Sequence, residues 1–107
     1  MEYYGANSKL QKILSDERML YRHYGKQKAD QIRLRLEEIQ QASTLAEINT
    51  LPPTRLHQLQ GSRKEQFSVD ISKNWRMILE GYNEGEMLTV RKEEAVIVLI
   101  VSIEDYH

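Results

Sequence analysis

The N-terminal part of the chain places apolar side chains every three or four positions, which is the spacing of one face of an α-helix. From Ser8 to about Tyr24 this spacing predicts a first helix, and Gly25 is placed to end it. From Lys26 to about Ala42 it predicts a second, amphipathic helix, because an apolar stripe lies opposite charged positions. The stripe consists of Ala29, Ile32, Leu36 and Ile39, and the charged positions include Lys28, Arg33, Arg35 and Glu37. Such a stripe is expected to pack on a sheet.

The period changes to two after Pro52-Pro53, which predicts half-buried β-strands. Apolar residues alternate with polar ones from Phe67 to Ile71 and from Trp75 to Glu80, and Ser72 to Asn74 join these strands as a tight hairpin. An earlier strand is expected at about Arg55 to Leu59. The three strands are expected to form an antiparallel meander.

The segment from Val96 to Val101 is apolar at odd and even positions alike. This predicts a strand that is covered on both faces and is therefore central in the sheet. A short strand is also expected within residues 1–6, and the polar segment from Glu84 to Glu94 is expected to be a long hairpin loop. These elements predict an α+β fold in which two N-terminal helices pack on a small, mainly antiparallel sheet of about four strands. A chain of 107 residues has room for one core, so residues 1–107 are expected to form a single domain.

The composition of the chain mainly excludes certain kinds of site and classes of protein. The chain has no cysteine, which rules out disulfides and thiolate sites. Its longest apolar run, residues 95–101, is far shorter than the ~20 residues of a membrane helix, and its N-terminus does not resemble a signal peptide, so a cytoplasmic protein is expected. A net charge of −1 lacks the excess of cations typical of nucleic-acid binding, although five cations lie between Arg22 and Arg35. These cations are either a basic face or ordinary solvated charges.

Three side chains stand out for their chemistry, and each also has an ordinary structural explanation. Arg76 interrupts an apolar strand, where a guanidinium is either an anion-binding fork or half of a cross-strand ion pair with Asp70 or Glu80. His57 lies in the earlier predicted strand, and His107 ends the chain after the expected central strand. Each histidine is either a proton-transfer group near neutral pH or an incidental surface residue.

Three motifs together resemble the HigB branch of the RelE/ParE superfamily, the plasmid-maintenance killer toxins of bacterial type II toxin-antitoxin systems. They are Leu-His-x-Leu-x-Gly-x-Arg at 56–63, Asn-Trp-Arg at 74–76 and Asp-Tyr-His at 105–107. The resemblance extends over most of the chain and implies a sheet capped on one face by the two helices, with the active surface on the other face. It also implies a ribosome-dependent mRNA endonuclease that needs no cofactor or metal.

Carried over position by position, the resemblance implies catalytic roles for His57, Arg76, Asp105, Tyr106 and His107. Arg63 and Lys64, in the loop beside His57, and Lys73 in the hairpin are expected to contact RNA. Two imidazoles and a guanidinium suit metal-free RNA cleavage, which needs a base for the 2′-hydroxyl, charge stabilisation at phosphorus and an acid for the 5′-oxygen. The sequence leaves open which histidine is the base.

The resemblance also implies partners. These are a HigA-like helix-turn-helix antitoxin, expected in a toxin–antitoxin heterotetramer, and the ribosome with its mRNA; no membrane contact is expected. Two other classes of function stay open: a ParE-like toxin that poisons gyrase by binding, and a non-catalytic partner of an antitoxin. In both, the histidines have no nuclease role. Gln60 and Ser62 stand where the family commonly has lysine and aspartate, so one expected phosphate-binding cation is missing.

Overall fold

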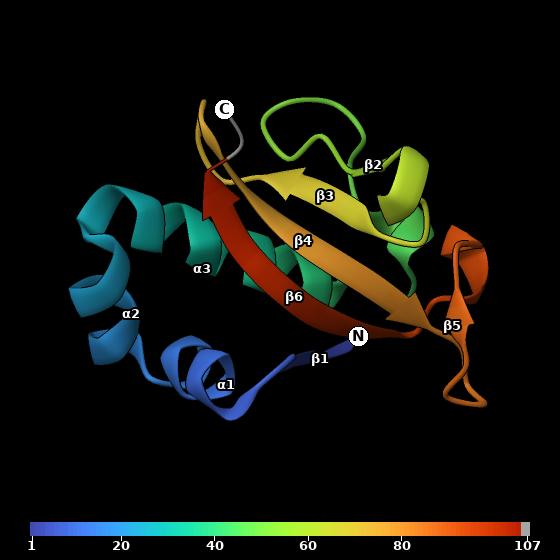
Figure 1. The fold of residues 1–107 in the computed structure, drawn as a ribbon, viewed down its shortest axis with the longest axis horizontal. Coiled ribbons are helices and arrows are strands. Elements are labelled where there is room, and N and C mark those ends of the chain that lie inside the picture. The colour runs from blue at the N-terminus through green and yellow to red at the C-terminus, as the bar shows by residue number, and fades with distance from the viewer. Residues whose placement is uncertain (106–107) are drawn as a thin grey trace.

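A twisted sheet forms one layer of the fold and helices form the other, as Figure 1 shows for this computed structural model, which describes residues 1–105. The helices are α1 (Ser8–Ser15), α2 (Glu17–Tyr24) and α3 (Lys26–Gln41), with 3₁₀ turns at Leu45–Glu47, Gly61–Arg63 and Lys92–Glu94. The strands are β1 (Glu2–Gly5), β2 (His57–Gln58), β3 (Phe67–Asp70), β4 (Trp75–Tyr82), β5 (Leu88–Thr89) and β6 (Ile97–Asp105). The predicted α+β class is confirmed. No helix in this described part of the chain is long and apolar enough to cross a membrane.

The prediction of one helix from Ser8 to Tyr24 is wrong, because α1 and α2 are separate helices that meet at Asp16. Asp16 has an extended backbone (φ −123°, ψ 107°), and its carboxylate accepts hydrogen bonds from the amides of Arg18 and Met19. An aspartate that caps a new helix in this way competes with continuation of the old one. The apolar spacing runs across the break, so periodicity alone does not reveal it.

The second predicted helix is confirmed as α3, and its apolar stripe is buried against the sheet. The expectation that Arg35 belongs to the charged outer surface of this helix is wrong, because its side chain is only 3% exposed. Its guanidinium donates to the carbonyl of Asp70 at 2.7 Å and pairs with Glu38 at 3.1 Å. Burial of this cation is therefore compensated by partners at the end of β3 and within α3.

Six strands form the sheet in the order β1-β6-β4-β3-β2, with β5 paired to β4 off this path. The antiparallel meander of β2, β3 and β4 is confirmed, as is a strand at the N-terminus. The sheet is larger than the expected four or so strands, and it is mixed, because β1 runs parallel to β6. The Glu84 to Glu94 segment is not only a loop: β4 continues past Glu80 to Tyr82, and this extension offers backbone partners to β5.

The strand expected from Arg55 to Leu59 is shortened to His57 and Gln58. Arg55 has a positive φ of 51°, which interrupts an extended chain. The amide of Leu56 donates to the carbonyl of Asn49 and not to a neighbouring strand. Side-chain alternation does not report either feature.

β6 lies between β1 and β4, as predicted, and extends to Asp105. Its pairing with β4 shifts at a bulge, so that Ile78 lies opposite Ser102 whereas Leu79 lies opposite Ile100. On the helix side Val98 and Ile100 are fully buried, but residues of the other parity are only half-buried. The predicted cover on both faces is therefore partial.

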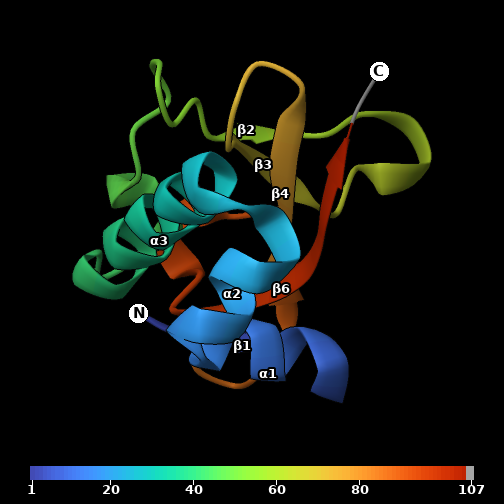
Figure 2. The ribbon, with the colours of Figure 1, turned by 90° about the vertical axis from the view of Figure 1, so that its left-hand side faces the viewer.

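The helices cover one face of the sheet only. Figure 2 shows α3 on one side of the strands and the Gly61–Arg63 turn on the other. The core between α3 and the sheet includes Phe67, Val69, Met77 and Leu79. On the opposite face Ser68 and Ile78 are also fully buried, so this second face is not simply open to solvent.

Replacing Gly5 with alanine is expected to destabilise the fold, because a Cβ there would lie 2.6 Å from the backbone nitrogen of Gln11 in α1. Helix α1 would have to move away from β1, a form of overpacking that typically costs about 1–3 kcal/mol. Urea unfolding measures the loss. Gly85→Ala is the matched control, since its Cβ would meet the Asn83 side chain at an ordinary 3.4 Å and stability should hardly change. Equal stability of the two variants would contradict the close packing of α1 on β1.

Candidate functional site

The sheet face opposite the helices gathers polar side chains from several strands, and we call it the polar face. Strand pairing places His57, Ser68, Ile78 and Ser102 in one row across β2, β3, β4 and β6, and Asp70, Arg76 and Glu104 in another. Residues paired across neighbouring strands share a face. Ser68 alternates with the core residues Phe67 and Val69, so both rows belong to the polar face.

His57 is half-buried on this face, and its ring orientation is set by the backbone. Its Nδ1 lies 2.9 Å from the carbonyl oxygen of Arg55. A carbonyl only accepts hydrogen bonds, so Nδ1 carries a proton and Nε2 holds the lone pair in the neutral ring. Nε2 is therefore the nitrogen that can take up or release a proton.

Arg55 is the residue that holds His57 in place, and sequence reasoning missed it. Besides accepting from the imidazole, it donates from its own guanidinium to both carboxylate oxygens of Asp70, at 2.8 and 3.2 Å. Such a two-pronged pair fixes the guanidinium in one orientation. The left-handed backbone of Arg55 allows its carbonyl and its side chain to reach β2 and β3 at once.

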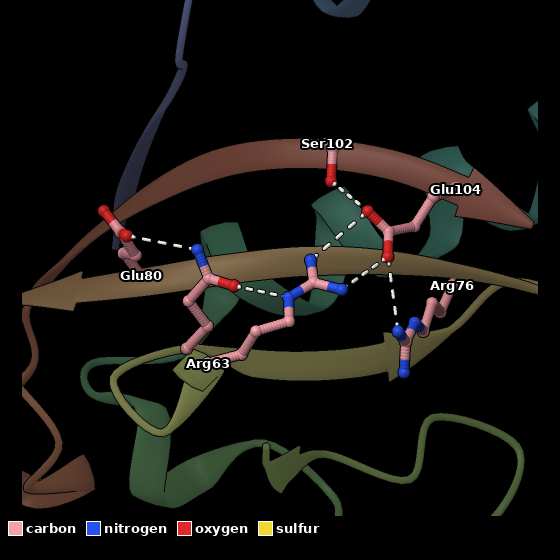
Figure 3. A network of polar contacts seen from close by, with 6 residues as sticks. Arg63, Arg76, Glu80, Ser102 and Glu104 are labelled. Atoms are coloured by element: carbon pink, nitrogen blue, oxygen red, sulfur yellow. Dashed lines mark hydrogen bonds and ion pairs between the residues drawn. The ribbon is translucent and has the colours of Figure 1, made fainter. Parts of the chain in front are cut away.

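Arg63 and Arg76 converge on a single carboxylate, that of Glu104 (Figure 3). Oε1 of Glu104 accepts from Nη1 of Arg63 at 2.8 Å and from Nη2 of Arg76 at 3.2 Å. Oε2 accepts from the hydroxyl of Ser102 at 2.8 Å and from Nη2 of Arg63 at 3.3 Å. The ordinary explanation for Arg76 is thus correct in kind, but the ion pair found within residues 1–105 is with Glu104 rather than with Asp70 or Glu80.

The Arg63 side chain crosses the polar face to make this contact. It comes from the 3₁₀ turn after β2, and its Nε donates to Gln66, whereas Glu104 lies on β6 beyond β3 and β4. Glu80 is bonded to neutral groups, the amide of Gln66 and the hydroxyl of Tyr82. Arg63 thus stands in the expected loop beside β2, and its side chain extends over the sheet to the carboxylate that Arg76 also binds. Its expected contact with RNA stays a prediction.

Glu104 is a second residue of this face that sequence reasoning missed. A signal existed, since Ser102 and Glu104 are polar positions on either side of the apolar Ile103, as expected for one face of a strand. The Arg63 guanidinium, helped by Ser102 and Arg76, lowers the pKa of Glu104 to about 2, against a partial burial that raises it. Its carboxylate is therefore ionised at neutral pH.

The polar face is partly covered, since His57, Arg63 and Arg76 are half-buried on it and Ser68 and Ile78 are fully buried. A cleft of about 590 Å³ lies on the helix side, lined by Lys28, Gln31, Ile71 and Trp75 among others, and His57 and Arg76 are not part of it. Small-molecule sites are usually concave and largely apolar. Half-buried arginines beside a histidine suit a polyanion better than a small apolar ligand.

Comparison with known families gives a match over residues 6–91, to the family described as "RelE-like toxin of type II toxin-antitoxin system HigB". The chain belongs to this family. It is thus a toxin of a type II toxin-antitoxin system, and an antitoxin is its partner. None of the curated proteins matches the chain.

The matched range of this toxin contains His57, Arg63 and Arg76 and ends before β6. Two further expected RNA contacts also fall within it: Lys64 follows the Gly61–Arg63 turn, and Lys73 lies in the hairpin between β3 and β4; both are exposed. Neither lysine has an ion pair among those found within residues 1–105.

The C-terminal residues of the toxin are placed only in part. Asp105 is the last residue of β6, is exposed, and lies opposite Trp75 of β4. Successive residues of a strand alternate between its two faces, so Asp105 belongs to the helix side of the sheet and Glu104 to the polar face. The strand end lies beside the β3–β4 hairpin, as Figure 1 also shows. Tyr106 and His107 lie outside the described residues. Within residues 1–105, no group of three or more histidine, aspartate or glutamate side chains is arranged to hold a metal ion.

Acid should weaken the fold through Glu104, because its pKa falls from 4.5 to about 2 on folding. A carboxylate whose pKa is lowered by folding stabilises the fold above its unfolded pKa, and this contribution disappears as the pH falls through its folded pKa. Since the Glu104 side chain is 30% exposed, solvent screening reduces the effect to about 1–2 kcal/mol.

Urea unfolding at about pH 6 and about pH 3 measures this contribution. Wild type should lose more stability than Glu104→Gln between the two pH values, by roughly half or more of the amount given above, because pH 3 is still above the folded pKa. Other carboxylates titrate equally in both proteins, so they cancel in the difference. An identical pH dependence of the two proteins would mean that the Arg63–Glu104–Arg76 contacts add nothing to stability.

Proposed function

We propose that this toxin is a ribosome-dependent endoribonuclease that cuts mRNA without a metal ion and thereby stops translation. The observation that carries the proposal is the placement of His57, Arg63 and Arg76 on the same face of the sheet. The Cα atoms of His57 and Arg76 are two strand spacings and two residues apart, which corresponds to roughly 12 Å. Long side chains from such positions can reach one phosphodiester and its ribose.

RNA cleavage at this face requires two proton transfers and one charge-stabilising group. The 2′-oxygen attacks phosphorus as its proton passes to a base, and the bond to the 5′-oxygen breaks as an acid protonates that oxygen. His57, through Nε2, supplies one of these proton transfers and His107 the other. Arg76 stabilises the negative charge that develops on the phosphoryl oxygens.

The remaining site residues have supporting roles in this proposal. Asp105 orients a histidine or a substrate hydroxyl, and Tyr106 stacks on a base or positions the sugar. Arg63, Lys64 and Lys73 contact the phosphates of the message or of ribosomal RNA. No cofactor takes part.

The antitoxin in this proposal is a HigA-like helix-turn-helix protein that forms a heterotetramer with the toxin in the cytoplasm. The family description supports an antitoxin and leaves its type to experiment. Coexpression with the neighbouring gene product, followed by measurement of the mass of the complex in solution, tests the stoichiometry. A complex with a different composition would exclude the heterotetramer.

Inducible expression in bacteria tests the proposed activity. Growth is recorded, and the 5′ ends of translated messages are mapped before and after induction. Wild type should arrest growth and create new 5′ ends in phase with codons, and His57→Ala and His107→Ala should create none while remaining folded.

Other outcomes distinguish the alternatives. Growth arrest with intact messages and damaged DNA would favour a ParE-like toxin that binds gyrase. Normal growth with folded protein would favour a non-catalytic partner of the antitoxin. Either outcome would remove the nuclease proposal.

A further inference from the structure

Two arginines from distant parts of the chain bind one carboxylate on the polar face, that of Glu104. The Gly61–Arg63 turn supplies one guanidinium and β4 the other, and both bind the same oxygen of Glu104 within 3.2 Å. Ser102 donates to the second oxygen from the same strand as Glu104, which holds the carboxylate in position. Arg63, Arg76 and Ser102 thus form an anion-binding site that is occupied by a carboxylate of the protein itself, that of Glu104 (Figure 3).

A phosphodiester has the same requirements as this carboxylate. Each carries one negative charge, and each presents oxygens that accept paired hydrogen bonds from guanidinium groups. An RNA phosphate that binds Arg63 and Arg76 must therefore replace Glu104 or lie beside its charge. Like charges at such short distances repel.

Glu104 remains a competitor at neutral pH because it stays ionised; its contacts with Arg63, Ser102 and Arg76 lower its pKa to about 2. It is also only partly buried, at 30% exposure, so its side chain has room to move aside. A second arginine of this face is also paired with a carboxylate: Arg55 forms an ion pair with Asp70. The polar face is thus close to neutral, although it carries three arginines.

We propose that Glu104 acts as an internal competitor for the RNA phosphate: its carboxylate occupies the anion site between Arg63 and Arg76 until a message displaces it. Glu104 both keeps the two arginines aligned and lowers the affinity of the toxin for free RNA. This inference rests on the proposed function, since it assumes that RNA is the ligand of this face. It gives a physical reason for dependence on the ribosome, which holds the message in place and so offsets the cost of displacing Glu104.

Glu104→Gln tests the competition because it removes the charge and keeps the shape and one acceptor oxygen, although its amide nitrogen can only donate. The probe is a short, fluorescein-labelled oligoadenylate with 2′-methoxy groups, which block cleavage, and anisotropy measures its binding across a salt series. Glu80→Gln is the matched control: it removes one charge from the same face, where Glu80 is bonded to Gln66 and Tyr82. Circular dichroism verifies that all variants are folded.

Glu104→Gln is expected to bind the oligonucleotide about tenfold more tightly than wild type, since a competing charge-assisted interaction is gone. Its salt dependence should be steeper by about one unit in the logarithmic slope, because one more phosphate is neutralised. Glu80→Gln should change affinity by no more than about twofold. The gain in affinity from Glu104→Gln should disappear when Arg63 is also replaced by alanine. The two side chains contact each other, so the effects of their substitutions are not additive.

A gain for Glu104→Gln no larger than that for Glu80→Gln would overturn the inference, and this includes the case in which no variant binds free RNA. That failure is separate from failure of the proposed function. Mapping of message 5′ ends decides the latter with wild-type protein in cells. If the toxin cuts messages but Glu104→Gln has no specific effect on RNA affinity, the proposed function stands and the role of Glu104 as a competitor is wrong.

Discussion

Replacement of His57 by alanine is expected to slow message cleavage by about 10²–10⁴-fold, which is the usual contribution of a positioned acid or base. The bond from its Nδ1 to the Arg55 carbonyl leaves Nε2 to exchange the proton. His57→Asn separates this role from a structural one, because an asparagine amide can still donate to that carbonyl but cannot titrate. Single-turnover cleavage of a defined message on purified ribosomes measures the rate for both variants.

His23→Ala provides the control for this experiment. His23 is an exposed histidine of α2 whose ring contacts Tyr24 at a centroid distance of 4.8 Å. The variant loses the same type of side chain away from the polar face, and its cleavage rate should equal that of wild type. Full activity of His57→Asn would show that His57 transfers no proton.

Loss of the Arg76 guanidinium is expected to reduce cleavage by about 10²–10³-fold, as removal of one charge-stabilising donor does in other phosphoryl and acyl transfers. Arg76 is 20% exposed near the start of β4, where it pairs with Asp70 of β3 and Glu104 of β6 in the strand register, so its position is set by the sheet. Arg76→Lys should recover only part of the rate, because lysine keeps the charge and loses the planar fork. The same ribosome assay distinguishes the two variants.

Arg91→Ala controls for the simple loss of a positive charge. The Arg91 side chain is 71% exposed and pairs with Glu94 at 3.7 Å, away from the polar face. Its removal should leave the cleavage rate unchanged. If Arg76→Ala cleaved as fast as Arg91→Ala, the role of Arg76 would be limited to its ion pair with Glu104.

Prediction of the fold from sequence succeeded where a local pattern has one interpretation. Apolar spacing located α3, and alternation located β3, β4 and the hairpin between them. It failed where a single residue overrides the pattern, as Asp16 does by capping α2 and Arg55 by its positive φ. The parallel pairing of β1 with β6 joins the two ends of the chain, and no local pattern reports such contacts.

The sequence by itself determined which residues are available for chemistry and that His57, Arg63 and Arg76 belong to recognisable motifs, because motif and period are properties of neighbours along the chain. Only the tertiary structure decided that Arg63 crosses the sheet to meet Arg76 at Glu104. That contact joins residues 41 positions apart, and it depends on strand order and on the register of β4 with β6. It also decided that Arg35 is buried, since its hydrogen bond to the Asp70 carbonyl exists only after α3 has packed on the sheet, whereas its ion pair with Glu38 lies within α3. Charges that appear free in a sequence are paired by folding, because an unpaired charge is costly to bury.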